Sequence, residues 1–352
     1  MSRAPLCVAG LPEGLLLAKR EMVSRCHGAE RPIGGAIATH YRIADLRRQA
    51  GRLVHAIGIG RKLVAGKSTS TLSIRLYVTR KLPRSLIGAA ELIPALVDGI
   101  PTDIIEAPPA FFAAPPVFPC TLKRLKRQRP LHAGTSFGHV TVVGGTLGAS
   151  VRSRLAGEEA LHLALSNNHV LADFGAVGLG TGVCQPSAGD GGMEADTVGR
   201  LLRFAPIVAD GTTENRVDAA VAAMDDAIRI SPGICGVGTV HGTAAASLGM
   251  AVHKHARTTG YSQGVIDDID CDVMLPIDRN APNRVARFVH QLRIRSKNGT
   301  SRFAQSGDSG ALIVAKASGA ATGLLFACPD HGGYAYANPI QAVLDELRVD
   351  LA

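Results

Sequence analysis

Residues 303–314 have the sequence Phe303-Ala304-Gln305-Ser306-Gly307-Asp308-Ser309-Gly310-Ala311-Leu312-Ile313-Val314, a polar turn that runs into an apolar stretch. Glycines on both sides of Asp308 and Ser309 let the backbone turn tightly, which would lift the Ser309 hydroxyl into a cleft. The turn also leaves the backbone N–H groups of Gly307 and Ser309 free to face a developing oxyanion. Serine alone is a poor nucleophile, so this role requires a histidine base and a carboxylate elsewhere in the chain.

Composition favours a globular protein with many short strands. The chain has 352 residues, of which 46% are apolar and 4% aromatic, with 40 glycines and 19 prolines. This length is enough for two or three domains, and frequent glycine and proline are typical of turns between strands. The core must be built mainly from Ala, Val, Leu and Ile, since tryptophan is absent.

The N-terminus and the cysteines predict a cytoplasmic protein. The modest apolar run Leu15-Leu16-Leu17 is too short for a secretory signal or a membrane span. Seven cysteines, an odd number without a close pairing pattern, argue against a disulfide framework. We therefore expect free thiols in a reducing cytoplasm, without a membrane anchor and without a structural zinc site.

Residues 1–107 predict a short tail followed by a small α/β domain. We expect residues 1–35 to be an N-terminal tail and residues 36–107 to form the domain. The helices expected there span 36–50 and 90–97, and the strands span 54–60, 71–78 and 102–106, because apolar residues recur at helical or alternating spacing.

A turn in this domain partly matches a phosphate-binding loop. Gly66-Lys67-Ser68 has the end of that motif, but Arg61 stands where the first glycine is required. The loop should also open a helix, whereas an alternating strand pattern follows. A solvent-facing hairpin is therefore favoured over a nucleotide site.

Residues 108–130 are predicted to be a linker. Its first part is rich in proline and should be extended and semi-rigid. Its second part carries the basic residues Lys123, Arg124, Lys126, Arg127 and Arg129. Because no aromatic residues are interleaved with these charges, a solvated interdomain face is favoured over a nucleic-acid site.

Residues 131–352 are predicted to be mainly β. Short apolar segments cut by glycine continue as far as a helical pattern over residues 339–347. This pattern is typical of a β-sandwich or barrel with a C-terminal helix.

Two residues in this half can complete the chemistry of Ser309. His169 stands at the end of a strand pattern, beside the small polar residues Asn167 and Asn168. Asp218 begins an apolar strand, where burial would cost several kcal/mol unless its charge is hydrogen-bonded, for example by an imidazole N–H. A surface role is the alternative for each. The order His169, Asp218, Ser309 is that of chymotrypsin-type enzymes.

A metal site is one alternative at His253-Lys254-His255. Two histidines one residue apart on a strand share a face and could bind a metal. No third ligand is evident in the sequence, so no metal and no other cofactor is predicted.

The second half resembles the trypsin-like, chymotrypsin-fold serine peptidases, and the chain from about residue 35 resembles the NARROW LEAF 1 group and its bacterial relatives. The motifs that carry the resemblance are Gly144 to Gly148, Leu165 to Ala172, Gln185-Pro186, Asp190 to Gly192, Val217 to Ala220, Arg257 to Gly260, Gly307 to Leu312, Gly323 to Ala327 and Ala337 to Ile340. Looser matches are Ile57 to Gly60, Tyr77 to Pro83 and Gly99 to Asp103. The resemblance implies a chymotrypsin-like double β-barrel for residues 131–352 and a triad of His169, Asp218 and Ser309.

The expected function is that of a serine endopeptidase acting on protein or peptide substrates. The alternative is a catalytically idle protease fold used for binding or as a scaffold, since a fold does not guarantee activity. The physiological substrate, a homo-oligomeric state, the role of the N-terminal region and any activation step are left open.

The resemblance also implies a pocket for the side chain before the scissile bond. The residue six positions before the nucleophile, Phe303, would form its base. Phe326-Ala327-Cys328 would form one wall and Tyr334 the other. An incoming lysine or arginine would find no carboxylate there, so we expect a preference for small or medium apolar side chains.

Overall fold

The structure is a computed structural model that describes residues 10–27, 54–83, 85, 87, 92–107, 111–112, 123–277, 284–297, 302–330 and 332–352. The helices are α1 (Glu13–His27), α3 (Asn168–Leu171) and α4 (Ile340–Glu346), with short 3-10 turns η4 (Lys123–Leu125), η5 (Asp173–Gly175), η6 (Ala188–Asp190) and η7 (Glu194–Asp196). None of the described helices is long and apolar enough to cross a membrane. Cys184, Cys235 and Cys271 are free thiols.

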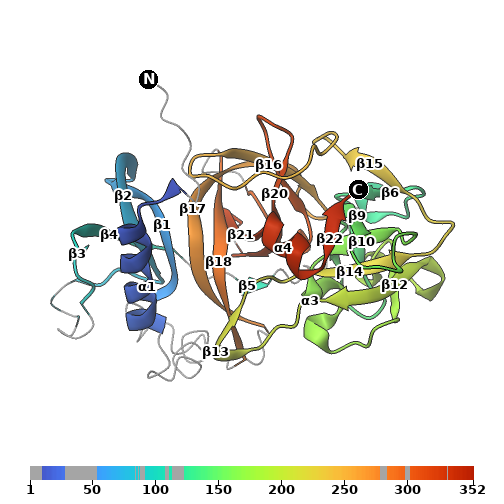
Figure 1. The fold of residues 1–352 in the computed structure, drawn as a ribbon, viewed down its shortest axis with the longest axis horizontal. Coiled ribbons are helices and arrows are strands. Elements are labelled where there is room, and N and C mark those ends of the chain that lie inside the picture. Colours follow the sequence, from blue (N-terminus) through green and yellow to red (C-terminus); the bar gives the residue numbers. More distant parts are fainter. Residues whose placement is uncertain are drawn as a thin grey trace.

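A closed six-stranded barrel lies at the centre of the molecule (Figure 1). Its strands are β16 (Ala251–Ala256), β17 (Gly260–Pro276), β18 (Val285–Ser296), β19 (Leu312–Ala315), β20 (Ala321–Cys328) and β21 (Tyr334–Pro339). Each strand pairs antiparallel with two others in the order β16-β17-β18-β21-β20-β19, and β19 returns to β16 to close the ring. Because the ring is closed, each of its strands is hydrogen-bonded to a neighbouring strand on both edges. Strand β13 (Asp210–Asn215) adds to β18 from outside the ring.

A second, curled sheet lies beside the barrel. Its strands are β7 (Ser136–His139), β8 (Gly145–Thr146), β9 (Ala149–Ser153), β10 (Leu163–Ser166), β11 (Gly182–Cys184), β12 (Thr197–Phe204), β14 (Ala220–Met224) and β22 (Val349–Leu351). A shared apolar core joins the sheets, because Leu163 and Val221 pack in one cluster with Leu312, Leu324 and Ile340 of α4. A two-stranded pair, β6 (Leu131–Ala133) with β15 (Ile230–Ile234), lies beside it.

The two curled sheets resemble the predicted double barrel, and the prediction of a mainly β fold is confirmed. The predicted C-terminal helix over residues 339–347 is also confirmed as α4. Short apolar segments were a sufficient signal for strands such as β19 and β20, because both faces of these strands are buried and such strands have continuous apolar runs.

The N-terminal strands extend the sheet of the barrel. They are β1 (Val54–Val64), β2 (Lys67–Val78), β3 (Leu96–Val97) and β4 (Ile100–Glu106), and β1 pairs antiparallel with β17. Helix α1 buries Leu15, Ala18 and Met22 in a cluster with Ile57 and Ile59. This helix lies within the segment expected to be a tail.

Other expectations for this region had mixed outcomes. The strands predicted at 54–60, 71–78 and 102–106 and the hairpin at Gly66 are confirmed. The helix predicted over 90–97 is wrong for the described residues, because Leu96–Val97 form β3. The Asp98-Gly99 turn has positive φ at both residues and pairs β3 with β4, and Pro94 disfavours a helix interior. The helix predicted at 36–50 lies outside the described residues.

Buried charges hold the N-terminal strands against the barrel. Arg75 Nη1 of β2 lies 2.8 Å from Asp268 Oδ1 of β17, and both side chains are buried. Burial raises the pKa of Asp268 to about 6, although the charges of Arg75 and Arg293 act in the opposite direction. The Arg293 guanidinium lies 4.6 Å from the Tyr77 ring centroid and 4.1 Å from that of Tyr334.

Gly60 leaves the space that the ion pair needs, which gives a prediction about stability. A Cβ at this position would lie 2.2 Å from Asp268 Oδ1 and 2.6 Å from Arg75 Nε. We expect Gly60→Ala to lower the free energy of unfolding by about 1–3 kcal/mol, measured by urea denaturation, because the buried pair must move. Gly14→Ala is the matched control, since no atom lies within 4 Å of its Cβ position and alanine favours a helix. Equal stability of the two variants would contradict this packing.

Candidate active site

His169 and Asp218 are brought together by neighbouring strands. His169 lies in α3 just after β10, and Asp218 lies just before β14, which pairs antiparallel with β10. His169 Nδ1 lies 2.5 Å from Asp218 Oδ2, and the His169 backbone N–H donates to Asp218 Oδ1 at 3.2 Å. The predicted contact of an imidazole with a buried carboxylate is therefore present.

Two asparagines hold the backbone of Asp218. Asn338 accepts from the Asp218 N–H through Oδ1 at 3.1 Å and donates to the Asp218 carbonyl through Nδ2 at 3.1 Å. Asn167 Nδ2 donates to the same carbonyl at 2.6 Å. Asn338 was not among the predicted site residues, although it belongs to one of the motifs that carry the family resemblance.

An aromatic ring lies beside the imidazole. The rings of Phe174 and His169 stack with centroids 5.7 Å apart. Phe174 and the preceding Asp173 both have positive φ, which is uncommon for residues other than glycine. Strained backbone of this kind concentrates at functional sites, so the loop that positions Phe174 is a candidate part of the site.

The Ser309 turn has the conformation expected from its glycines. Gly307 and Gly310 have φ values of 92° and 93°. A Cβ at Gly310 would lie 2.2 Å from the Thr146 carbonyl oxygen and 2.3 Å from Ser166 Oγ, so a side chain cannot fit. Within the described part of the chain, the N–H groups of Gly307 and Ser309 make no hydrogen bond, which leaves both available to an oxyanion.

Gly145 separates Ser309 from Val170, the residue next to His169. Gly145 fits between them, because a Cβ there would lie 2.5 Å from Val170 Cγ2 and 2.7 Å from the Ser309 carbonyl oxygen. The Ser309 hydroxyl donates to the Phe326 carbonyl at 3.2 Å. Direct hydrogen bonds therefore join His169 and Asp218. Ser309 belongs to the neighbouring barrel, and its hydroxyl is hydrogen-bonded to the Phe326 carbonyl of β20.

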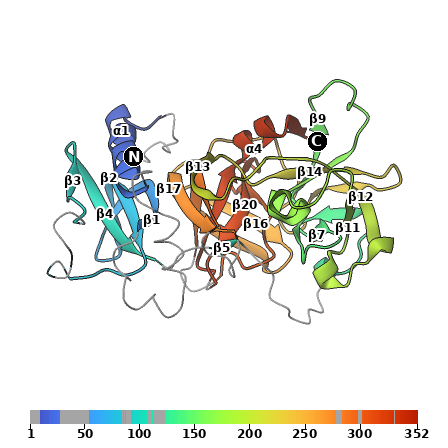
Figure 2. The ribbon, with the colours of Figure 1, turned by 90° about the horizontal axis from the view of Figure 1, so that it is seen from below.

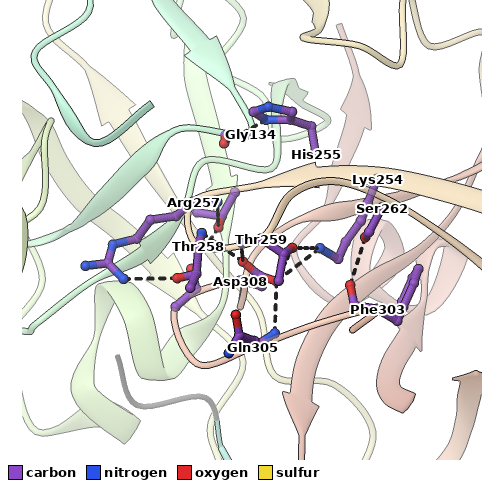
Figure 3. Close-up of polar contacts among 12 residues, drawn as sticks. Gly134, Lys254, His255, Arg257, Thr258, Thr259, Ser262, Phe303, Gln305 and Asp308 are labelled. Carbon is purple, nitrogen blue, oxygen red and sulfur yellow. Dashed lines mark hydrogen bonds and ion pairs between the residues drawn. The ribbon is translucent and has the colours of Figure 1, made fainter. Parts of the chain in front are cut away.

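The carboxylate of Asp308, next to Ser309, is buried among donors (Figure 3). It accepts from the backbone N–H groups of Thr258, Thr259 and Gln305 at 2.9–3.0 Å. The Thr259 hydroxyl donates at 2.7 Å, and Lys254 Nζ donates at 3.1 Å. Burial lowers the pKa of the Lys254 ammonium, and the charge of Asp308 acts in the opposite direction.

Further polar contacts support the backbone of the turn. The Thr258 hydroxyl donates to the Ser306 carbonyl at 2.7 Å, and the Thr146 hydroxyl donates to the Gly307 carbonyl at 2.9 Å. The Arg257 guanidinium lies 2.3 Å from the position that a Cβ would take at Gly307. It donates hydrogen bonds to both carboxylate oxygens of Asp190 at 2.6 Å.

Basic residues of the predicted linker bond within the chain. Arg124 donates to the carbonyl oxygens of Arg257 and Thr258 at 2.5 and 2.6 Å. Arg129 Nη1 donates to Gln185 Oε1 at 2.8 Å. Arg124 therefore ties η4 to the loop beneath the Ser309 turn.

The predicted pocket residues lie in the central barrel. Phe303 is fully buried, and a Cβ at Gly264 would lie 2.8 Å from its Cε2 atom. Phe326, Ala327 and Cys328 lie in β20, and Tyr334 lies in the adjacent β21. A described cavity of about 500 Å³ lies elsewhere, between α1 and strands β13, β17 and β18.

The two histidines of the alternative metal site, His253 and His255, are hydrogen-bonded within the chain. His253 Nδ1 lies 3.2 Å from the Tyr261 hydroxyl, and His255 Nδ1 donates to the Gly134 carbonyl at 3.1 Å. Among the residues that the structure describes, no group of three or more His, Cys, Asp or Glu side chains could hold a metal ion.

Comparison with known proteins gives distant structural matches. No protein-family model and no curated protein matches the chain. Protease A of Thermobifida fusca is 19% identical, over 64% of this chain and 99% of that chain, with a TM-score of 0.45. The Nocardiopsis protease is 17% identical over 64% and 99%, with a TM-score of 0.44. A glutamic acid specific serine protease is 17% identical over 63% and 100%, with a TM-score of 0.44.

The ion pair beneath Ser309 gives a second prediction about stability. Lys254→Met would leave the Asp308 carboxylate buried without its counter-ion, and we expect a loss of about 3–5 kcal/mol in the free energy of unfolding. Lys316→Met is the control, because Lys316 is exposed and donates to the Gln263 side chain. Urea denaturation of both variants measures the difference. A Lys254→Met variant as stable as the control would show that the pair does not hold this turn.

Proposed function

We propose that the protein is a serine endopeptidase that uses His169, Asp218 and Ser309. The observation that carries this proposal is the hydrogen bond of His169 to a fully buried Asp218, with Gly145 packed between Val170 and the carbonyl of the glycine-flanked Ser309. A buried carboxylate fixes the tautomer and orientation of an imidazole, which can then act as a general base.

In this proposal, each residue has a role in one step of acyl transfer. Ser309 Oγ attacks the scissile carbonyl while His169 accepts its proton and later delivers that proton to the leaving amine. The N–H groups of Gly307 and Ser309 stabilise the oxyanion of the tetrahedral intermediate. Water then hydrolyses the acyl-enzyme with His169 again acting as base.

The finer assignments made from the sequence belong to this proposal. They are the kinship with the NARROW LEAF 1 group, a peptidase unit over residues 131–352 preceded by residues 36–107 and a linker over 108–130, and a cytoplasmic location. The sequence motifs support the kinship. The hydrogen-bond donors around Asp308 support a Ser309 turn that is ordered without a separate activation step.

Replacement of the nucleophile tests the proposal. We expect Ser309→Ala to abolish peptide cleavage, because removal of the nucleophile of a comparable serine hydrolase costs on the order of a millionfold in rate. The measurement is hydrolysis of a peptide library, with circular dichroism and thermal unfolding to verify that the small substitution preserves the fold.

A fluorophosphonate probe separates the enzyme from an idle scaffold. The wild-type protein should be labelled at Ser309, and the Ser309→Ala variant should not. Cleavage by the variant within about tenfold of the wild-type rate would place the activity elsewhere. A wild-type protein that neither cleaves nor reacts would favour the scaffold.

We also propose that the substrate pocket prefers small or medium apolar side chains before the scissile bond. Phe303 at the predicted base and Phe326 on one wall occupy volume and carry no charge. The carboxylate nearest to this pocket base, Asp308, is already paired with Lys254, whose ammonium lies 5.4 Å from the Phe303 ring centroid, so an incoming lysine or arginine meets no unpaired carboxylate there.

The expected specificity can be measured with matched peptides. Substrates with Ala, Val or Leu before the scissile bond should be cut faster than those with Lys or Arg, with graded differences of about 10–200-fold among apolar side chains. Phe303→Ala should shift the preference toward larger apolar residues. Phe137→Ala is the control, because it removes an equally buried ring from another core cluster. A wild-type profile dominated by Lys and Arg would contradict the pocket assignment.

A further inference from the structure

A short segment of the predicted linker pairs with the barrel next to Ser309. Strand β5 (Phe111–Phe112) is antiparallel to the end of β20, with Phe112 opposite Ala327 and Phe111 opposite Cys328. Figure 2 shows β5 beside β20 in the central barrel. These are the residues of β20 that follow directly on Phe326, whose carbonyl accepts the Ser309 hydroxyl.

The pairing of β20 shows which of its edges β5 occupies. One edge is covered by β21, which pairs with Leu325 and Ala327. The other edge pairs with β19. Beyond β19, the same edge binds the Ser309 turn, because the Gly310 N–H donates to the Leu325 carbonyl and the Leu325 N–H donates to the Ala311 carbonyl. Because β21 already occupies the opposite edge at Ala327, β5 lies on the edge that carries Ser309.

The direction of β5 is that of a peptide approaching the nucleophile. From Phe111 to Phe112 the chain moves from Cys328 to Ala327, and hence toward Phe326 and Ser309. In peptide hydrolysis, residues on the N-terminal side of the scissile bond lead in the N-to-C direction to the carbonyl that is attacked. A bound peptide that used this edge would therefore follow the same course as β5.

We propose that β5 is an intramolecular competitor for the substrate edge of β20, so that the chain restrains its own candidate active site. The inference rests on the proposed peptidase function. Addition of a strand to an exposed sheet edge is a general way to bind extended peptides, with main-chain hydrogen bonds supplying the affinity. Two paired residues bind weakly by themselves, but their tether to the barrel gives them a millimolar effective concentration. The restraint is thus reversible and can be displaced by a longer substrate.

The test removes the hydrogen-bonding capacity of β5 in the full-length chain. Phe111→Pro combined with Phe112→Pro deletes both backbone N–H groups that the strand can offer. We expect fluorophosphonate labelling of Ser309 and peptide hydrolysis to accelerate at least about tenfold, because the competent fraction rises. Phe111→Tyr with Phe112→Tyr is the matched control, which keeps both N–H groups and should behave as wild type.

Two further measurements do not depend on turnover by the wild-type chain. A synthetic peptide of residues 107–116, Ala-Pro-Pro-Ala-Phe-Phe-Ala-Ala-Pro-Pro, should inhibit the proline variant competitively. Hydrogen exchange on proteins that also carry Ser309→Ala should show that the one amide of the pair Ala327 and Cys328 that faces β5 loses protection when the prolines are introduced, because successive N–H groups of a strand face opposite edges.

The outcomes separate this inference from the function on which it rests. Equal activity of the wild-type and proline variants, with no inhibition by the peptide, would overturn the competitor and leave the peptidase assignment intact. Cleavage of the chain within the segment would show that β5 is a substrate and not a restraint. Absence of labelling and hydrolysis in every protein would overturn both.

Discussion

The buried carboxylate of Asp308 is the constraint on which the candidate site depends. A carboxylate without contact with water is tolerated only where donors surround it. Here the donors come from β16, from the loop between β16 and β17, and from the turn itself. Because these segments cannot move independently without exposing or stranding the charge, the barrel determines the backbone around Ser309.

The site lies where two sheets meet, and each sheet contributes part of it. His169 follows β10, and Asp218 precedes β14, in the curled sheet. Ser309 belongs to the barrel, and the apolar cluster that includes Leu163 and Leu324 holds the sheets together. Strand β20 pairs within the barrel, accepts the Ser309 hydroxyl and pairs with β5, so the edge that β5 occupies is the edge that carries Ser309. Packing between the sheets therefore positions the candidate site, and the proposed competitor acts through the pairing along one strand.

Several elements were predictable from the sequence because their causes are local. Alternation along residues 71–78 predicted a strand, and β2 is a strand there. Helix α1 was missed, although Leu15, Ala18 and Met22 have helical spacing, because the apolar run in this segment was considered only as a secretory signal or a membrane span. The helix predicted at 90–97 was wrong for Leu96–Val97, since the Asp98-Gly99 turn pairs these residues with β4. Periodicity alone does not reveal such a partner.

The sequence by itself determined the conformation of the Ser309 turn, since Gly307 and Gly310 can adopt positive φ where other residues are strained. It also determined the candidate chemistry, because histidine, aspartate and serine occur in strand-end and turn contexts that suit those roles. Only the tertiary structure decided that Lys254, flanked by two histidines in a polar stretch, is buried against Asp308 and that β5 lies beside Ser309. The physical reason is the separation along the chain of the residues that interact. Backbone conformation follows from neighbouring residues, whereas the burial of a charge and the partner of a strand edge depend on segments that are distant in the chain.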